Sequence, residues 1–118
     1  MDTFKALAAF TALAQPTRLA AFRRLLAAYP EAVPAGEVAR RCKVPHNTMS
    51  THLAALTRAG LVAVRRNGRG MNYSADLDGF RALVTFLTRD CCNGRPEICA
   101  PMLADLADPC RPAERACG

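Results

Sequence analysis

Apolar positions along the chain recur mostly at helical spacing, which predicts a succession of helices interrupted by one pair of strands. The first helical run covers residues 4–14 and stops at Gln15. The second run begins at Pro16, a residue favoured in the first turn of a helix. Its apolar positions form one stripe: Leu19, Phe22, Leu25 and Leu26. Two prolines then predict a loop over residues 29–34.

Two further helices are predicted over residues 37–42 and 46–59, joined by a short turn at residues 43–45. The turn follows from Pro45, because the residue before a proline disfavours helical geometry. Asn47 is the expected N-cap of the second of these helices, and Gly60 is its C-terminal stop. Its expected core face is Met49, Leu53 and Leu56. This arrangement is typical of a helix-turn-helix, in which the second helix reads DNA.

A strand pair and a last helix follow. Residues 61–64 and 71–74 predict two short strands around a basic, glycine-rich turn at residues 65–70, and such a pair after a reading helix forms the wing of a winged helix. Asp76 or Asp78 is expected to cap the last helix. Its apolar stripe is Phe80, Leu83, Val84, Leu87 and Cys91.

These elements predict an α+β, mostly helical fold with two parts. Residues 1–92 are expected to form a winged helix-turn-helix with N- and C-terminal dimerisation helices. Residues 93–118 form a Cys-containing tail in which prolines and glycines leave room for one helical turn, at residues 101–106. The length of 118 residues suits a single domain, and 51% hydrophobic with 22% charged residues suits a folded protein.

Nothing in the sequence indicates a membrane protein. The longest apolar stretch, residues 6–14, is interrupted by Thr11 and is far shorter than the roughly 18 to 20 residues of a membrane span. The first residues lack the basic and apolar regions of a signal peptide. We therefore expect a cytoplasmic protein.

The net charge of +6 is concentrated in one segment. Residues 38–75 contain seven Lys or Arg residues and no Asp or Glu, while the other nine basic residues are outnumbered by all ten acidic ones. A sustained basic segment is typical of a surface that meets a polyanion, here nucleic acid. A solvated basic face is the alternative interpretation.

Candidate DNA contacts lie on the reading helix and on the wing. The first turns of the helix carry polar side chains that suit bases or phosphates: Asn47, Thr48, Ser50, Thr51 and His52. On the wing, contacts to phosphates or to a minor groove are expected from Arg65, Arg66 and Arg69. Capping or plain solvation is the alternative for Ser50 and Thr51, and a structural hydrogen bond for His52. Because one helix reads too few base pairs, we expect a dimer on half-sites about 34–36 Å apart.

Three stretches in this order carry a family resemblance. They read Ala-Leu-Ala-Gln-Pro-Thr-Arg-Leu at residues 12–19, Ser-Thr-His-Leu-Ala-Ala-Leu at 50–56 with Ala-Gly-Leu-Val at 59–62, and Arg-Arg-Asn-Gly-Arg at 65–69 with Tyr73. Over about residues 4–92 the chain resembles the ArsR/SmtB family of metal- and metalloid-responsive repressors. The resemblance implies a homodimer, built on the first and last helices, that binds operator DNA when ligand-free and releases it when ligand binds.

Six cysteines suggest a second site, for a ligand. In a reducing compartment, thiols usually indicate metal binding or redox sensing rather than a disulfide framework. Cys91, Cys92 and Cys99 form a three-thiol cluster in the sequence, and thiolates select soft ions. Trivalent arsenic or antimony takes three thiolates, whereas zinc would need a fourth, from Cys110 or Cys117. Cys91 alone is also compatible with a core position.

The known sensor sites of the family are absent from this sequence. The stretch that holds its Cys-Val-Cys arsenic site reads Glu-Val-Ala-Arg-Arg-Cys here, at residues 37–42, and Cys42 is expected to be a buried small hydrophobe. The Asp and His pairs of its zinc sensors are also missing, since the two histidines are His46 and His52. Because members place sensor sites at different points of one scaffold, the resemblance suggests a relocated As(III) or Sb(III) site at the last helix.

The sequence thus predicts a dimeric repressor released by As(III) or Sb(III). The alternatives within DNA binding are a redox sensor, with a Cys92–Cys99 disulfide, and a zinc-responsive regulator. An enzyme is not expected, because the sequence has no Cys-x-x-Cys on a βαβ pattern and no phosphate loop. A metal-buffering protein would leave the basic segment without a role.

Overall fold

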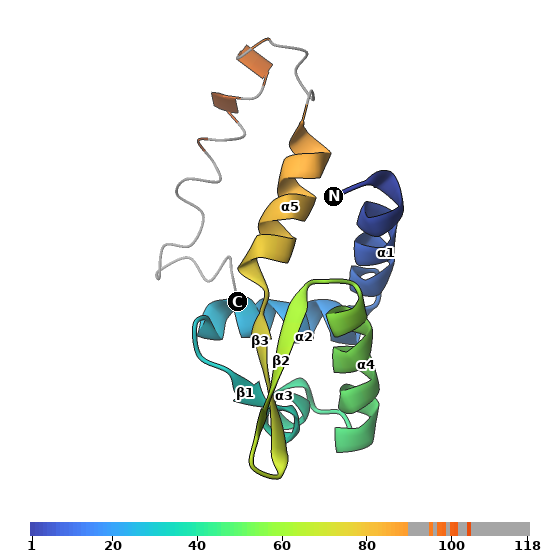
Figure 1. The fold of residues 1–118 in the computed structure, drawn as a ribbon, viewed down its shortest axis with the longest axis vertical. Coiled ribbons are helices and arrows are strands. Elements are labelled where there is room, and N and C mark those ends of the chain that lie inside the picture. Colours follow the sequence, from blue (N-terminus) through green and yellow to red (C-terminus); the bar gives the residue numbers. More distant parts are fainter. Residues whose placement is uncertain (90–94, 96, 99, 102–103, 105–118) are drawn as a thin grey trace.

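A computed structural model describes residues 1–89, 95, 97–98, 100–101 and 104 (Figure 1). Within these residues the named elements are α1 (Thr3–Leu13), α2 (Pro16–Ala28), β1 (Val33–Pro34), α3 (Ala35–Cys42), α4 (His46–Arg58), β2 (Val62–Asn67), β3 (Gly70–Ala75) and α5 (Leu77–Thr88). The fold is therefore mostly helical α+β with a wing, as predicted. Among the described residues of the tail, 97–98, 100–101 and 104 are helical, so helical residues also occur before the turn expected at residues 101–106.

The wing is longer than the sequence predicts. β2 and β3 pair antiparallel from Val62 opposite Ala75 to Asn67 opposite Gly70, and Gly68 begins the two-residue loop with a φ of +62°. A glycine with positive φ at this position is typical of a tight hairpin turn whose twist matches the strands. The turn predicted over residues 65–70 is wrong in extent, because Arg65 and Arg66 lie in β2 rather than in the loop.

A short edge strand completes the sheet in the order β1-β3-β2. β1 pairs with β3 through only Val33 opposite Tyr73 and Pro34 opposite Asn72, within the segment predicted as a loop. The proline is tolerated because β1 is an edge strand, where the missing N–H breaks no central ladder.

The first helix of the helix-turn-helix begins earlier than predicted, and the second begins at the predicted residue. α3 begins at Ala35 instead of Glu37, and its C-terminal cap is Lys43 in the left-handed region at φ 61°. α4 begins at His46 with the extended Pro45 as its N-cap, so the expectation that Asn47 caps this helix is wrong. The Pro45 carbonyl already accepts from the Met49 N–H at 3.0 Å, which places Asn47 inside the first turn.

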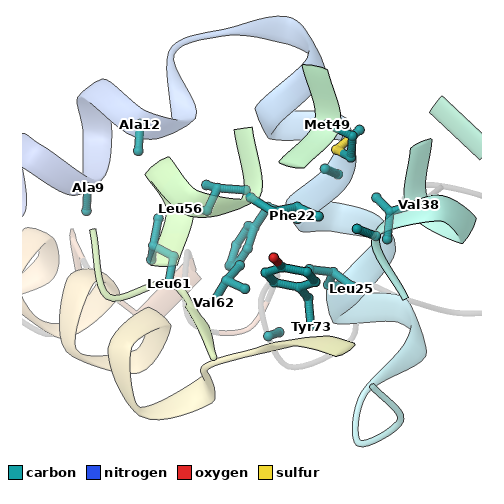
Figure 2. Packing of buried hydrophobic residues seen from close by; sticks show 14 of the residues in the cluster. Ala9, Ala12, Phe22, Leu25, Val38, Met49, Leu56, Leu61, Val62 and Tyr73 are labelled. Carbon is teal, nitrogen blue, oxygen red and sulfur yellow. The ribbon is translucent and has the colours of Figure 1, made fainter. Parts of the chain in front are cut away.

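The core forms around the inward face of α4, as predicted. Met49, Leu53 and Leu56 are fully buried, and they pack in one cluster with Phe22 and Leu25 of α2 (Figure 2). The ring of Phe22 also meets Phe80 of α5 edge to face, with centroids 5.4 Å apart. The remaining buried residues of this cluster lie on α1, α2, α3, β2, β3 and α5, with Leu61 between α4 and β2: Ala6, Ala9, Ala12, Ala21, Ala35, Val38, Ala39, Leu61, Val62, Tyr73, Ala75 and Leu83.

α5 is capped as predicted at its start but ends early. The Asp76 carboxylate accepts from the Gly79 N–H at 3.0 Å, which confirms Asp76 as the N-cap. The helix ends at Thr88, and Arg89 is extended. The expectation that the apolar stripe of this helix runs on to Cys91 is therefore wrong. Cys91, Cys92 and Cys99 lie outside the described residues.

Several large apolar side chains on α1 and α5 stay in contact with solvent. α1 buries three alanines, while Phe4 and Leu7 are 73% and 60% exposed. On α5, Leu83 is buried but Leu87 is 61% exposed. Both helices lie at the end of the molecule opposite the tip of the wing (Figure 1). In the described part of the chain, no helix combines the length and the apolar character needed to cross a membrane.

A substitution at Gly79 tests how closely the start of α5 packs against the turn that follows α4. A Cβ on Gly79 would overlap the carbonyl oxygen of Gly60, so Gly79→Ala has no room without a backbone shift. We expect this substitution to lower the free energy of unfolding by about 1–3 kcal/mol, measured by urea unfolding followed by circular dichroism. Gly70→Ala is the matched control, because its Cβ would meet only the Asn67 carbonyl oxygen at 3.7 Å. Equal unfolding midpoints for the two variants would contradict the close approach.

Candidate nucleic-acid interface

The outward face of α4 presents the polar residues predicted to contact DNA. Asn47, Thr48 and Thr51 are exposed, while Ser50 and His52 are half-buried on either side of them. This division follows from helical geometry, since Met49 and Leu53 hold the opposite face in the core. The first turn of α4 and the tip of the wing lie at the same end of the molecule (Figure 1).

The hydroxyl groups on this face differ in how they are engaged. Thr51 Oγ1 donates to the Asn47 carbonyl at 3.2 Å, so its proton is already used within the helix. Thr57, further along α4, donates in the same way to the Leu53 carbonyl at 2.8 Å. The Ser50 hydroxyl and the Asn47 amide have no side-chain hydrogen bond to any described residue. Both therefore keep their full donor capacity for an incoming partner.

His52 is engaged with α2. The Arg18 Nε–H donates to His52 Nδ1 at 3.1 Å, which requires a neutral imidazole with its proton on Nε2. Burial, and then the charge of Arg18, lower the pKa of His52 below its usual value. The structural hydrogen bond considered as the alternative for His52 is therefore present, and its role in DNA binding stays a prediction. Sequence reasoning missed Arg18 as the partner, although this residue lies in the stretch that carried the family resemblance.

The charge of the basic segment is divided between α3 and the wing. Glu37, one residue before the acid-free stretch, pairs with Arg40 and also accepts from Arg41 Nε at 2.8 Å. These hydrogen bonds, Arg41 first, lower the pKa of Glu37. On the wing, Arg65, Arg66 and Arg69 are exposed and form no ion pair within the described residues. The strongest unneutralised positive charge therefore lies on the wing.

The one cysteine of the described residues lies away from this face. Cys42 is half-buried at the end of α3 and packs against the core, as expected of a small apolar side chain. Among the described residues, no three His, Cys, Asp or Glu side chains come together as a metal site would require. The predicted thiol ligands Cys91, Cys92 and Cys99 fall outside that part of the chain.

Comparison with known proteins agrees with this architecture. Residues 13–65 match the sequence family described as a helix-turn-helix domain. HlyU from Vibrio cholerae is 29% identical, with a TM-score of 0.60 over 78% of this chain and 99% of that chain. A homodimeric winged helix-turn-helix DNA-binding domain from Mycobacterium bovis, a possible ArsR-family regulator, is 25% identical, with a TM-score of 0.60 over 78% and 85%. A search of curated protein sequences gave no match.

In sequence and fold the chain is similar to the ArsR/HlyU winged helix-turn-helix regulators. An ArsR-like regulator from Rhodococcus, 24% identical, has the same fold with a TM-score of 0.67 over 86% of this chain and 92% of its own. The predicted fold class and the family resemblance are thereby confirmed. The helix-turn-helix match and these similar proteins support a transcriptional regulator of this type.

The hydrogen bond between Arg18 and His52 predicts a pH-dependent stability. Because the pKa of His52 is lower in the folded protein than its usual 6.5, the unfolded chain takes up the proton first. The contribution of neutral His52 to the free energy of unfolding is complete above pH 6.5, and it is lost as the pH falls from there through the lowered pKa. We expect the urea midpoint to decrease between pH 7.5 and 5.5 in the natural protein and in His46→Gln, but much less in His52→Gln. The same slope in all three proteins would refute this role.

Proposed function

We propose that this ArsR/HlyU-type regulator is a homodimeric repressor, which binds operator DNA through α4 and the wing and leaves it when As(III) or Sb(III) binds Cys91, Cys92 and Cys99. The observation that carries the DNA part is the exposed polar start of α4 beside three exposed wing arginines, Arg65, Arg66 and Arg69. Such a helix fits the major groove, and wing arginines contact phosphates or the minor groove and so set its register.

The dimer is supported by the apolar surface of α1 and α5. Phe4, Leu7 and Leu87 are each at least 60% exposed, in a chain whose core elsewhere is well packed. Exposed apolar side chains gathered on two neighbouring helices are typical of an interface between subunits. The related domain from Mycobacterium bovis is homodimeric. Two copies related by a two-fold axis would place two α4 helices on successive half-sites.

The ligand is inferred from the chemistry of the three thiols. Thiolates bind soft, thiophilic centres, and three of them match the pyramidal coordination of As(III) or Sb(III) in number. With arsenous acid, three As–S bonds replace three As–OH bonds, and the thiol protons leave with the hydroxides as three water molecules. Cys91 follows the end of α5 at Thr88 by three residues, so capture would act next to the proposed dimer helix. A differential affinity of a few kcal/mol is enough to change operator occupancy strongly.

The dimer interface is tested by placing a charge on it. We expect Leu87→Asp to shift the protein from dimer to monomer in sedimentation velocity, because a buried unpaired carboxylate opposes association. Val64→Asp is the matched control, since Val64 is also exposed, at 39%, but lies on β2. A dimer that survives Leu87→Asp, or one that Val64→Asp also dissociates, would place the interface elsewhere.

Release by arsenite is tested by gel shift with the DNA upstream of the regulator's own gene. We expect the natural protein to bind this duplex and to release it on addition of arsenite. Replacing Cys91, Cys92 or Cys99 by Ser is expected to preserve DNA binding and abolish release. Cys42→Ser is the control, because Cys42 packs against the core, and it should release normally.

The outcomes separate the alternatives. Mass spectrometry of the arsenite-treated protein should show one added arsenic with the loss of three protons. Loss of two hydrogens on treatment with peroxide, together with release under peroxide alone, would instead identify a redox sensor. Release by zinc alone would identify a zinc-responsive regulator. If all three cysteine variants still release with arsenite, the ligand site is elsewhere in the chain.

A further inference from the structure

A hollow of about 250 Å³ lies between the start of α3, the start of α4 and the part of the wing formed by its loop and β3. Its polar lining comes from His46 and Ser50 of α4, Arg69 of the wing loop and Tyr73 of β3. Its volume is several times the roughly 30 Å³ that one water molecule occupies in the liquid, so it has room for a phosphate group. Three separate elements contribute to this one space.

The polar groups around the hollow have no partners within the described part of the chain. No hydrogen bond or ion pair there involves the side chain of His46, Ser50 or Arg69, in contrast to Thr51, whose hydroxyl bonds within α4. Tyr73 is only 8% exposed, yet its hydroxyl also makes no hydrogen bond to a described residue. His46 and Arg69 are exposed, and no polar side-chain atom of the described residues is both buried and unpartnered, so these groups meet solvent and are accessible to a ligand in the hollow.

The position of the His46 ring is set by local packing. His46 and Ser50 are one helical turn apart, so they share the face of α4 that looks toward the wing. The imidazole lies over Gly36 at the start of α3, where an added Cβ would come 3.4 Å from Cδ2 and 3.9 Å from Nε2. The absence of a side chain at Gly36 therefore leaves space beside the ring, inside the hollow.

The charge of the hollow favours an anion. Arg69 carries a full positive charge, and none of the residues lining the hollow is acidic. The nearest carboxylate along the chain, that of Glu37 beside Gly36, is already engaged by Arg40 and Arg41. A site with a guanidinium among its donors and no carboxylate suits a phosphate oxygen and repels a cation.

We propose that this hollow holds one phosphate of the DNA backbone, bound jointly by His46 and Ser50 of α4 and by Arg69 of the wing. The inference rests on the proposed binding of DNA by α4 and the wing, and it adds His46 as a contact and a single shared phosphate as the ligand. One phosphate held from both elements fixes their spacing on the duplex. It therefore contributes affinity that is independent of base sequence.

The test combines protein variants with neutralised phosphates. A duplex of the upstream DNA is prepared in versions that each carry an uncharged methylphosphonate at one backbone position. On the unmodified duplex, His46→Ala, Ser50→Ala and Arg69→Gln should each weaken binding by about tenfold to a hundredfold, the loss of one hydrogen bond to a charged group. Arg69→Gln should also make the slope of log K against the logarithm of the salt concentration shallower by about 1, because one phosphate contact is lost. Thermal unfolding of each variant verifies that it folds.

The decisive result is that the affinity losses of His46→Ala, Ser50→Ala and Arg69→Gln all vanish on the same methylphosphonate duplex. Arg66→Gln is the matched control, because Arg66 has the same charge on the same wing but does not line the hollow, so its effect should persist on that duplex. The shared phosphate would be overturned, with DNA binding still standing, by either of two results. One is that the affinity losses of His46→Ala and Arg69→Gln vanish at different phosphates. The other is that His46→Ala binds the unmodified duplex with full affinity. A natural protein that binds no duplex would overturn the proposed function and this inference with it.

Discussion

The burial of one face of α4 is the constraint on which the rest of the structure depends. Met49, Leu53 and Leu56 are completely removed from water against α2. Exposing any one of them would cost about 1.5–3 kcal/mol, a large share of the stability of a small domain. The helix therefore cannot rotate about its axis without a severe loss. For this reason Asn47, Thr48 and Thr51 must face outward.

The same core connects the DNA-binding end to the end where α1 and α5 lie. Phe22 packs in the cluster with the inward face of α4, and its ring meets Phe80 of α5. The start of α5 also lies against the turn that ends α4, because Gly79 approaches the Gly60 carbonyl closely. A displacement of α5 by a ligand bound beyond its end would thus act on packed contacts that reach α4. This gives the proposed release from DNA a physical route through the fold.

Local rules predicted the helices well and the strands less well. The apolar spacing of α4 and the carboxylate of Asp76 each act within one turn of chain, and both predictions are confirmed. Asn47 was assigned as a cap on its side chain alone, whereas Pro45 already has the extended geometry from which a helix can begin. β1 has two residues and exists only because β3 lies beside it, so no local pattern announces it. α5 ends three residues before Cys91, although the apolar spacing continues to that cysteine.

Three properties follow from the order of residues alone: which face of each central helix enters the core, where the turn of the helix-turn-helix falls and which segment carries the positive charge. These properties depend on the period of a helix, on the geometry imposed by proline and on the count of charged residues. Which distant side chains meet is visible only in the folded protein. Arg18 reaches His52 across 34 residues, and His46 and Ser50 share a hollow with Arg69 of the wing. Such contacts depend on how whole helices pack, because residues far apart in the chain are brought together only when the core between them is filled.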